Sequence, residues 1–306
     1  MTAGYPEPAF VPPPAVPAAG AVSAIPARAS LRQRARMITI ALLHSKTFMV
    51  GAVILLFWIL DAIFWPLFAP HDPFALDPIN TLTGPSRLHW FGTDDLGRDI
   101  FSRVLAGARS VLTIAPAATA LGLIGGITIG LITGYYRGLV DDVAMRLVDA
   151  LLAFPLIIIA VLVLAVLGAS TLNVIVVIAI VFTPLIARTV RSAVLVERDR
   201  EYVAAAKLLG APGVFIMARE ILPNVMGPVV VEATVRLGYA IFTAATLSFL
   251  GLGVQQPSPD WGLTISLGRS FLQVAPWIVL FPALALATLV VGLNLLADGL
   301  REVLAD

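Results

Sequence analysis

The sequence predicts an all-α membrane protein with six transmembrane helices. Of its 306 residues, 59% are hydrophobic and only 13% are charged, whereas a soluble domain carries about 25% charged and about 45–50% apolar residues. The apolar residues gather in stretches of the length, about 20 residues, that a helix needs to cross about 30 Å of hydrocarbon. A soluble chain could not bury this much apolar surface, so we expect the bilayer to act as its solvent.

The first part of the chain differs in composition from the rest. Residues 1–27 are rich in Pro and Ala, and no basic start precedes an apolar run, so a secretory signal peptide is not expected. Such a segment buries too little surface to offset its ordering entropy, and we expect a disordered cytoplasmic tail. A binding role for its run of three prolines is the alternative. Residues 28–47 are basic and amphipathic, which predicts a segment lying on the cytoplasmic face.

The membrane domain is predicted to occupy residues 48–306. Four residues, 168–171, separate the third and fourth spans, which indicates a tight helical hairpin. The first span is interrupted by Asp61 and Pro66, and the fourth is short and contains Pro184. The six expected spans are residues 48–68, 111–134, 147–167, 172–187, 225–250 and 276–297.

Lysine and arginine are distributed unequally between alternate loops. With the N-terminus inside, 14 of the 20 basic residues fall in inner segments and 5 in outer ones, while Arg236 lies within the fifth span. Inner loops of membrane proteins carry this excess, so the chain is expected to have both termini in the cytoplasm. The polar residues 70–109 then form an external loop, helical from Asp99 onward, and residues 188–224 form the long cytoplasmic loop.

Several classes of function are excluded by what the chain lacks. No Ser/His/Asp order or carboxylate pair indicates a catalytic residue, and Gly125-Gly126 has no following Gly-Lys-Ser/Thr of a phosphate-binding loop. The chain has no cysteine, and its three histidines, His44, His71 and His89, lie far apart in sequence. We therefore predict no metal site and no disulfide. A net charge of +1 gives no indication of nucleic-acid binding.

Two features inside the spans have alternative explanations. Gly122, Gly126, Gly130 and Gly134 recur every four residues and predict close helix packing, with a moving, pore-lining surface as the alternative. A charge at the centre of a span costs about 2.5–3.5 kcal/mol on insertion scales. Asp61 and Arg236 therefore either face the bundle or a wet cavity, or line a path across the membrane.

The cytoplasmic loop contains a distinctive segment between Glu197 and Asn224. Its pattern predicts a helix that ends at Gly210, then a turn, then a second short helix that ends before Pro223. Glycine suits the left-handed position after a helix, and small alanines leave a flat face against which another protein can dock. An ordinary helical connector is the alternative.

This segment resembles the EAA loop of ABC importer permeases. Ala204-Ala205-Ala206, Gly210 and Leu222-Pro223 stand at the spacing of that motif, although Ala204 replaces its Glu and Glu220 replaces its Ile. The start Glu201-Tyr202-Val203 is typical of the peptide-transporting branch, in which His is common at the position of Glu220. The resemblance assigns ATPase coupling to Glu201, Tyr202, Ala204, Ala205, Ala206, Gly210, Glu220, Leu222 and Pro223.

Further motifs resemble the C-type permeases of dipeptide, oligopeptide and nickel importers. Residues 91–103 are similar to the segment that follows the first span in that family, and residues 247–262 and 294–301 are similar to its later motifs. The residues of this external signature are Gly92, Thr93, Asp94, Gly97, Arg98, Asp99, Ser102 and Arg103.

The resemblance implies a type I ABC importer permease fold in the cytoplasmic (inner) membrane. It implies a homologous B-type permease, ATP-binding-cassette ATPase subunits that bind ATP and Mg²⁺, and an extracytoplasmic substrate-binding protein as partners, besides membrane lipid. The chain itself would hold no cofactor and no ATPase site. Peptides are the expected substrate, with nickel or another small solute as the alternative, and Asp61 and Arg236 become candidates for the translocation pathway.

A stand-alone secondary transporter and a membrane-embedded enzyme are the competing classes. The first predicts inverted repeats and buried proton-relay carboxylates, of which the sequence shows only Asp61. The second needs a cluster of catalytic polar groups within the spans, and the sequence shows none.

Overall fold

The computed structural model describes residues 39–305. The predicted tail and the first part of the amphipathic segment lie outside these residues, whereas residues 39–44 are helical. The described residues form helices and loops, with one isolated bridge between Thr93 and Asp99. An all-α chain is therefore confirmed.

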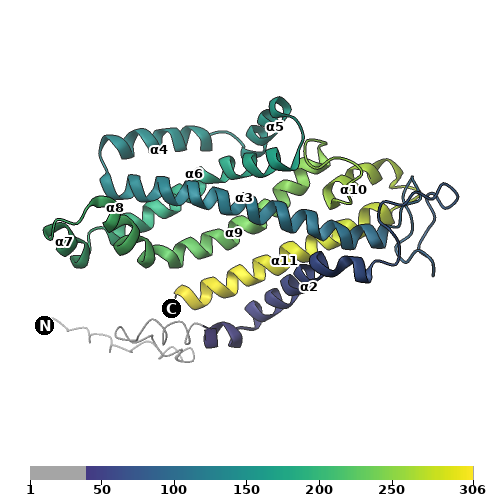
Figure 1. Ribbon diagram of the computed structural model, residues 1–306, viewed down its shortest axis with the longest axis horizontal. Helices are drawn as coiled ribbons and strands as arrows, with labels where there is room; N and C mark the ends of the chain where they lie inside the picture. Colours follow the sequence, from purple (N-terminus) through teal and green to yellow (C-terminus); the bar gives the residue numbers. More distant parts are fainter. Residues whose placement is uncertain (1–38, 306) are drawn as a thin grey trace, which may run out of the picture.

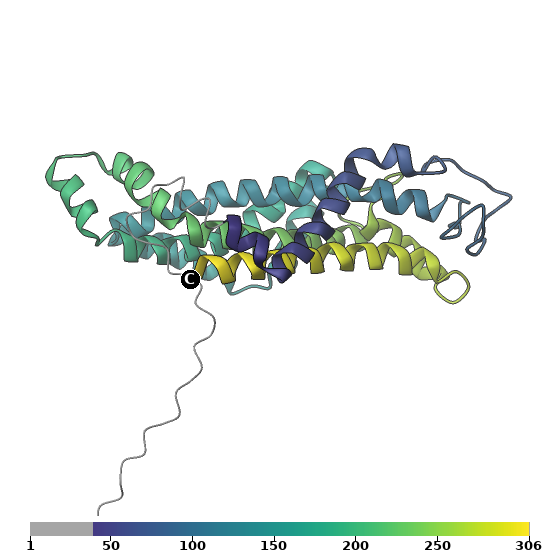
Figure 2. The ribbon, with the colours of Figure 1, turned by 90° about the horizontal axis from the view of Figure 1, so that it is seen from below.

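Five long apolar helices form the body of the protein. They run roughly along the long axis of the molecule, with the loop that precedes α3 at one end and α7 and α8 at the other (Figures 1 and 2). Each of the five is long and apolar enough to cross a membrane. They are α2 (Lys46–Phe68), α3 (Ile100–Tyr136), α6 (Thr171–Glu197), α9 (Leu222–Phe249) and α11 (Trp277–Ala305).

The third predicted span is broken. In place of a single helix over residues 147–167, α4 (Leu139–Leu152) and α5 (Leu156–Leu167) meet at a bend of 87°. Pro155 explains the break, because proline lacks the N–H that a continuing helix needs and drives the preceding residue out of helical geometry. Counted as a single broken span, this pair gives the sixth crossing.

Helices α3 and α6 form the central contact of the bundle. A Cβ added to Gly126 would lie 2.5 Å from Cβ of Ile186, and a Cβ added to Gly130 would lie 2.7 Å from Cβ of Val190. The glycine stripe on α3 therefore packs directly against α6, which confirms the packing interpretation. Helix α6 continues well beyond the predicted end of the fourth span, to Glu197, despite Pro184.

A second small-residue seam joins α2 to α11. A Cβ on Gly51 would lie 2.5 Å from the carbonyl oxygen of Gly292, and a Cβ on Gly299 would lie 2.7 Å from Cβ of Phe48. Most other side chains of α2 are exposed, as expected for a helix that faces lipid or another membrane subunit. The first and last spans are thus held together at the edge of the bundle (Figure 1).

Two short helices complete the outer end. Helix α10 (Trp261–Gly268) is capped by Asp260, whose side chain accepts a hydrogen bond from the Leu263 N–H, and is followed by the 3-10 turn η2 (Arg269–Phe271). Trp261 is fully buried, and its Nε1 donates to the carbonyl oxygen of Val104 at 2.8 Å. This contact fixes α10 against the start of α3.

Candidate functional site

Helix α7 (Glu201–Leu208) ends as the sequence predicts. Gly210 has φ +75°, its N–H donates to the Lys207 carbonyl at 3.0 Å, and the Ala211 N–H donates to the Ala206 carbonyl at 3.1 Å. This pair of bonds is a Schellman motif, which satisfies the last carbonyls of a helix and favours glycine at the left-handed position. The predicted end of the helix at Gly210 is confirmed.

An exposed apolar face lies around the end of α7. Leu208 and Leu209 are 90% and 87% exposed, and Val214 beyond the turn is 70% exposed. Ala204 and Ala205 are exposed on the same short helix. We call these five residues the α7 face. Contiguous exposed apolar residues commonly mark a protein interaction site, so the α7 face can receive a partner.

The opposite side of α7 is anchored to the bundle through Tyr202 and Val203. Val203 is fully buried. The Tyr202 hydroxyl donates to Oε1 of Glu197 at 2.8 Å and accepts from Nδ2 of Asn224 at 3.1 Å. Burial and the neighbouring Glu197 carboxylate raise the pKa of Tyr202 to about 12. A neutral hydroxyl thus links the end of α6, helix α7 and the start of α9.

The predicted end of the second helix before Pro223 is wrong. The single turn α8 (Gly213–Phe215) leads into the π-helical turn η1 (Ile216–Ile221), and this leads into α9 with no interruption. Proline has no N–H and disfavours the helix interior. Pro223, however, lies near the start of α9 and follows a wide turn in which the Leu222 N–H donates to the Met217 carbonyl. Such single π-helical turns occur within otherwise α-helical segments.

The unusual Glu220 contributes its main chain to this junction. Its carbonyl oxygen accepts a hydrogen bond from Nδ2 of Asn224 at 2.7 Å, and the Tyr202 hydroxyl lies 3.4 Å from it. The residue at position 220 therefore joins this junction through its carbonyl group, which any amino acid supplies. The departure from the family pattern at Glu220 leaves the connection between α7 and α9 intact.

Two arginines that sequence reasoning missed tie α6 to its neighbours. Arg198 Nη1 donates to the Tyr135 carbonyl at 2.9 Å, which joins the end of α6 to the end of α3. Arg191 makes two bonds to Asp141 on α4, Nε to Oδ1 at 2.5 Å and Nη2 to Oδ2 at 2.6 Å. Neither partner lies at a helical spacing from its arginine, so no sequence pattern indicated these pairs.

The external signature lies largely inside its own loop. The Asp94 carboxylate accepts from Nε of Arg98 at 2.7 Å and from the Arg98 N–H at 2.9 Å, and both side chains are buried. Arg103 is buried and donates to the carbonyls of Pro73 and Ser258, both at 3.0 Å. These charges hold the loop and α10 onto the start of α3 and are not presented to solvent.

Two glycines of the signature occupy positions that other residues would strain. Gly92 and Gly97 have φ of +74° and +75°. A Cβ on Gly97 would overlap the backbone carbonyl of Asp77, and one on Gly92 would lie 2.6 Å from Nε1 of Trp277. Glycine is thus required at both turns by backbone conformation and by space. Thr93, between them, is fully buried, and its carbonyl accepts from Trp277 Nε1 at 3.0 Å.

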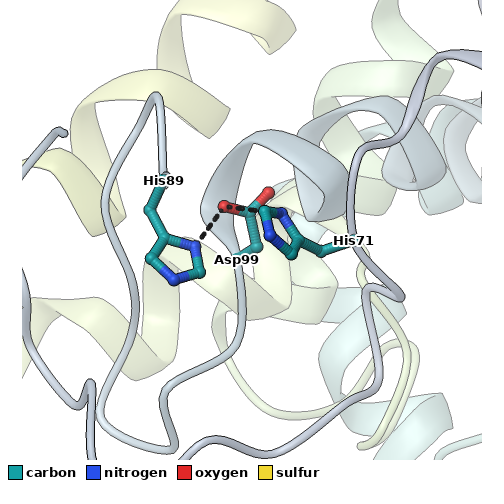
Figure 3. Close-up of side chains that lie close together, drawn as sticks. All are labelled: His71, His89 and Asp99. Carbon is teal, nitrogen blue, oxygen red and sulfur yellow. Dashed lines mark hydrogen bonds and ion pairs between the residues drawn. The ribbon is translucent and has the colours of Figure 1, made fainter. Parts of the chain in front are cut away.

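Asp99 and Ser102 begin α3 and bring two histidines together (Figure 3). Oδ2 of Asp99 accepts from the Ser102 N–H at 2.8 Å and from its hydroxyl at 2.7 Å, which makes Asp99 the N-cap. Oδ1 lies 2.9 Å from Nδ1 of His89 and 3.8 Å from Nδ1 of His71. His71 and His89, which lie far apart in sequence, are thus brought together because the loop folds back on the start of α3.

The two candidates for the translocation pathway differ in their surroundings. Asp61 is buried on α2, and its Oδ2 has no hydrogen-bond partner among the described residues. Arg236 is half-buried on α9 and pairs with Glu232, Nε to Oε1 at 2.5 Å, while its guanidinium lies 5.6 Å from the Tyr239 ring centre. Sequence reasoning missed Glu232, although its spacing of four residues is that of a helical ion pair.

Comparison with known proteins decides the family. Residues 126–306 match the family described as the inner membrane component of binding-protein-dependent transport systems, and residues 33–85 match the N-terminal transmembrane domain of oligopeptide transport permease C.

The chain belongs to this transport family. It is a multi-pass component of the inner membrane, as the apolar helices and their basic loops predict. The prediction that the chain is a membrane subunit of an ABC transporter, and not itself the ATPase, is confirmed by this membership.

Similar transport permeases cover most of the chain. The dipeptide transport system permease protein DppC of Alkalihalophilus pseudofirmus is 46% identical over 85% of this chain and 86% of its own length. The glutathione permease GsiD of Pectobacterium atrosepticum is 42% identical over 83% of this chain and 85% of its own length. The di/tripeptide permease DppC of Pseudomonas aeruginosa is 40% identical over 85% of this chain and 88% of its own length.

The fold of the permease is also found in a solved transporter. A chain of the inward-facing MetNI methionine ABC transporter matches with a TM-score of 0.55 at 20% identity, over 66% of this chain and 96% of that chain. The predicted type I ABC importer permease fold is confirmed by this match and by the family, while the orientation with both termini inside stays a prediction.

Proposed function

We propose that this chain is the C-type permease subunit of an ABC importer for dipeptides and oligopeptides. The observation that supports this most directly is the exposed α7 face, which flanks the Gly210 turn and whose helix is anchored to the start of α9 through Tyr202. The names of three relatives, for dipeptide, di/tripeptide and glutathione transport, support a peptide substrate.

The α7 face is the docking surface for the ATPase subunits in this proposal. ATP and Mg²⁺ bind to those subunits, and their closure pushes on α7. The push passes through two connections, the Tyr202 hydroxyl to Asn224 and the continuous helix from Gly213 into α9. Because packed helices transmit displacement with little compression, movement at α7 tilts α9 within the membrane.

Half of the translocation pathway is assigned to α9, and a homologous B-type permease supplies the other half. Tyr239 and Phe242 are 57% and 60% exposed on α9, and the Glu232–Arg236 pair is half-buried beside Tyr239. A peptide carries an ammonium and a carboxylate, and a pair of opposite charges on the pathway offers each a charge-assisted hydrogen bond. Asp61 on α2 stays the second candidate in this role.

The loop between α2 and α3 is the proposed docking site for the substrate-binding protein. Its signature residues are buried, so they keep the loop in shape, while Leu76, Ile79, Leu88 and Trp90 are exposed at the outer end of the molecule. Import of nickel or another small solute by the same assembly is the alternative substrate class. A secondary transporter that acts without partner subunits would have no partner to cover the exposed α7 face.

The coupling proposal is tested with a matched pair of glycines. Gly210 and Gly251 both have positive φ, +75° and +81°, and a Cβ at either would meet nothing within 4 Å. Gly251 follows the end of α9 with the same pair of hydrogen bonds, its N–H to the Ser248 carbonyl and the Leu252 N–H to the Leu247 carbonyl. Valine therefore imposes a similar backbone strain at both, about 1–2 kcal/mol, but only Gly210 borders the α7 face. We expect Gly210→Val to abolish dipeptide uptake and uncouple ATP hydrolysis in the assembled transporter, while Gly251→Val retains both at equal expression.

Normal uptake in Gly210→Val, or equal loss in both variants, would contradict the coupling role. The substrate class is tested in the same preparation by competition. An excess of unlabelled dipeptide should suppress uptake of a labelled dipeptide, whereas an excess of Ni²⁺ should not; the reverse result would support the alternative solute.

A further inference from the structure

Three segments of the external loop converge on one carboxylate oxygen. His71 lies just beyond the end of α2, His89 lies in the middle of the loop, and Asp99 is the N-cap of α3. Figure 3 shows both imidazole rings directed at the same side of the Asp99 carboxylate. The ring centres are 4.8 Å apart. We refer to these three residues as the His-His-Asp cluster.

The cluster has the dimensions of a metal site. One nitrogen of each ring and one oxygen of Asp99 all lie within 4.8 Å of one another, with Oδ1 2.9 Å from His89 Nδ1 and 3.8 Å from His71 Nδ1. Ligands about 2.0–2.2 Å from a shared Zn²⁺ are separated by about 3–4 Å. Small shifts of the two rings would therefore place all three atoms at bonding distance.

With both imidazoles neutral, the cluster carries one negative charge, on Asp99. The Asp99 side chain is 2% exposed, and a buried carboxylate is stabilised by hydrogen bonds or by an opposite charge. Ser102 donates twice to Oδ2, whereas the polar neighbours of Oδ1 among the described residues are the two imidazoles. The nearby arginines bind elsewhere, Arg98 to Asp94 and Arg103 to two carbonyls.

Two ring nitrogens in the cluster are left without a partner. Nδ1 of His71 and Nε2 of His89 are buried and have no hydrogen-bond partner among the described residues, and Nδ1 of His71 points at Asp99. A buried polar atom without a partner is unfavourable. The His71 side chain is 33% exposed, which opens a path from solvent and leaves room for water as a fourth ligand.

We propose that His71, His89 and Asp99 bind a divalent transition-metal ion of the Zn²⁺ class. The ligands are Nδ1 of each histidine and Oδ1 of Asp99, a nitrogen and oxygen set that such ions accept. To bind the ion through Nδ1, a neutral His89 carries its ring proton on Nε2, and Nδ1 then offers its lone pair to the metal. The ion joins the end of α2 to the start of α3 and fixes the loop between them.

The test uses the assembled transporter, purified through a histidine-free tag on another subunit. The complex is stripped with a chelator, reloaded with Zn²⁺ and analysed for bound metal. His71→Gln and His89→Gln should each weaken Zn²⁺ binding by more than about tenfold, since loss of a residue that only hydrogen-bonds to a metal ligand already weakens binding that much. His44→Gln is the matched control, because His44 is the remaining histidine and lies before α2.

Loading the wild-type complex with Co²⁺ gives a second measurement that needs no variant. Visible ligand-field bands of a nitrogen and oxygen site, displaced by Zn²⁺, are the expected result. The proposal is overturned if wild type binds no more metal than the His71 and His89 variants, if His44→Gln loses the ion equally, or if the Co²⁺ bands are absent. The cluster would then be a hydrogen-bonded clamp only.

Discussion

Tyr202 connects three elements through a single hydroxyl. It donates to Glu197 at the end of α6 and accepts from Asn224 at the start of α9, while its own helix carries the α7 face. Removing it with Tyr202→Phe should lower the free energy of unfolding by about 1–2 kcal/mol, because Glu197 and Asn224 lose a partner. Thermal unfolding of the assembled complex measures this. An unchanged transition temperature would show that these bonds do not hold α7.

The pH dependence of this link follows from the raised pKa of Tyr202. A tyrosine whose folded-state pKa rises from 10.0 to about 12 binds its proton more tightly when folded. Its contribution is therefore complete below about pH 10 and is lost as the pH approaches 12. Ultraviolet titration of wild type against Tyr202→Phe should show a tyrosinate signal that appears only in this range. A difference signal below pH 10 would contradict the assignment.

The sequence indicated Tyr202 through a motif, but the partners of its hydroxyl came from the fold. Asn224 is far along the chain, beyond the Gly210 turn, so no local spacing pairs the two residues. His71 and His89 show the same limit, since a loop brings them together. By contrast Gly210 could be predicted in full, because the end of a helix depends only on neighbouring backbone groups.

Among the elements, α3 and α6 pack too closely along the glycine stripe to admit a larger side chain. Gly126→Val would place a side chain within 2.5 Å of Ile186 Cβ, so the helices must separate, at a cost of about 1–3 kcal/mol or more. Gly227→Val on α9 is the control, because a Cβ there meets nothing within 4 Å. Yield and thermal stability of the purified complex should fall for Gly126→Val alone. An equal loss of thermal stability in both variants would mean that the effect comes from the helix propensity of valine and not from the packing of α3 against α6.

Helix α4 is held to α6 by two ion pairs of different quality. Arg191 binds Asp141 through two bonds, and the Asp141 side chain is 8% exposed, whereas Arg188 and Asp149 are 64% and 58% exposed with a single contact at 3.1 Å. Arg191→Gln should therefore destabilise the complex by about 1–2 kcal/mol, and Arg188→Gln by less than about 1 kcal/mol. The unfolding temperatures of the two variant complexes measure this difference. A larger decrease for Arg188→Gln than for Arg191→Gln would contradict the prediction.

Two prolines explain where the predicted elements were wrong. Pro155 interrupts an apolar run whose composition alone predicts a span, so hydropathy overlooked the bend. Pro223 was expected to end a helix, yet the π turn before it leads into α9 without a break, with the Leu222 N–H bonded to the Met217 carbonyl. Proline can break a helix or stand in its first turn, and sequence spacing alone does not show which of the two occurs.

At the scale of the whole molecule, the two polar ends should lie on opposite sides of the membrane. The chain has no cysteine, so single cysteines report their own positions. Ala75→Cys, exposed in the external loop, should react with an impermeant maleimide in intact cells, whereas Ala204→Cys on the α7 face should react only after permeabilisation. Reaction of Ala204→Cys in intact cells would contradict the orientation.

The ATPase subunits should also protect Ala204→Cys when they are present. Its reaction with maleimide in permeabilised membranes should slow severalfold in the assembled transporter compared with the chain expressed alone, while Ala75→Cys should be unaffected. Equal labelling of Ala204→Cys with and without the ATPases would place their docking surface elsewhere.

The general organisation of the molecule could be predicted from sequence because it depends on hydropathy, loop charge and spaced motifs. The part that each residue of a motif plays in the structure could not be predicted. Asp94, Arg98 and Arg103 look like exposed charges of an external loop, yet they are buried and hold its shape. The spacing of Glu232 and Arg236 is that of a helical ion pair, but the sequence does not show that both side chains are half-buried on α9.

The uninterrupted helix from Gly213 to Phe249 has a mechanical consequence. Its 37 residues correspond to about 55 Å at the usual helical rise, against about 30 Å of hydrocarbon. In the proposed assembly this helix is a lever that pivots where it enters the bilayer, with arms of about 25 and 30 Å. A displacement of its cytoplasmic end by the ATPase subunits would move its outer end by a similar distance in the opposite direction.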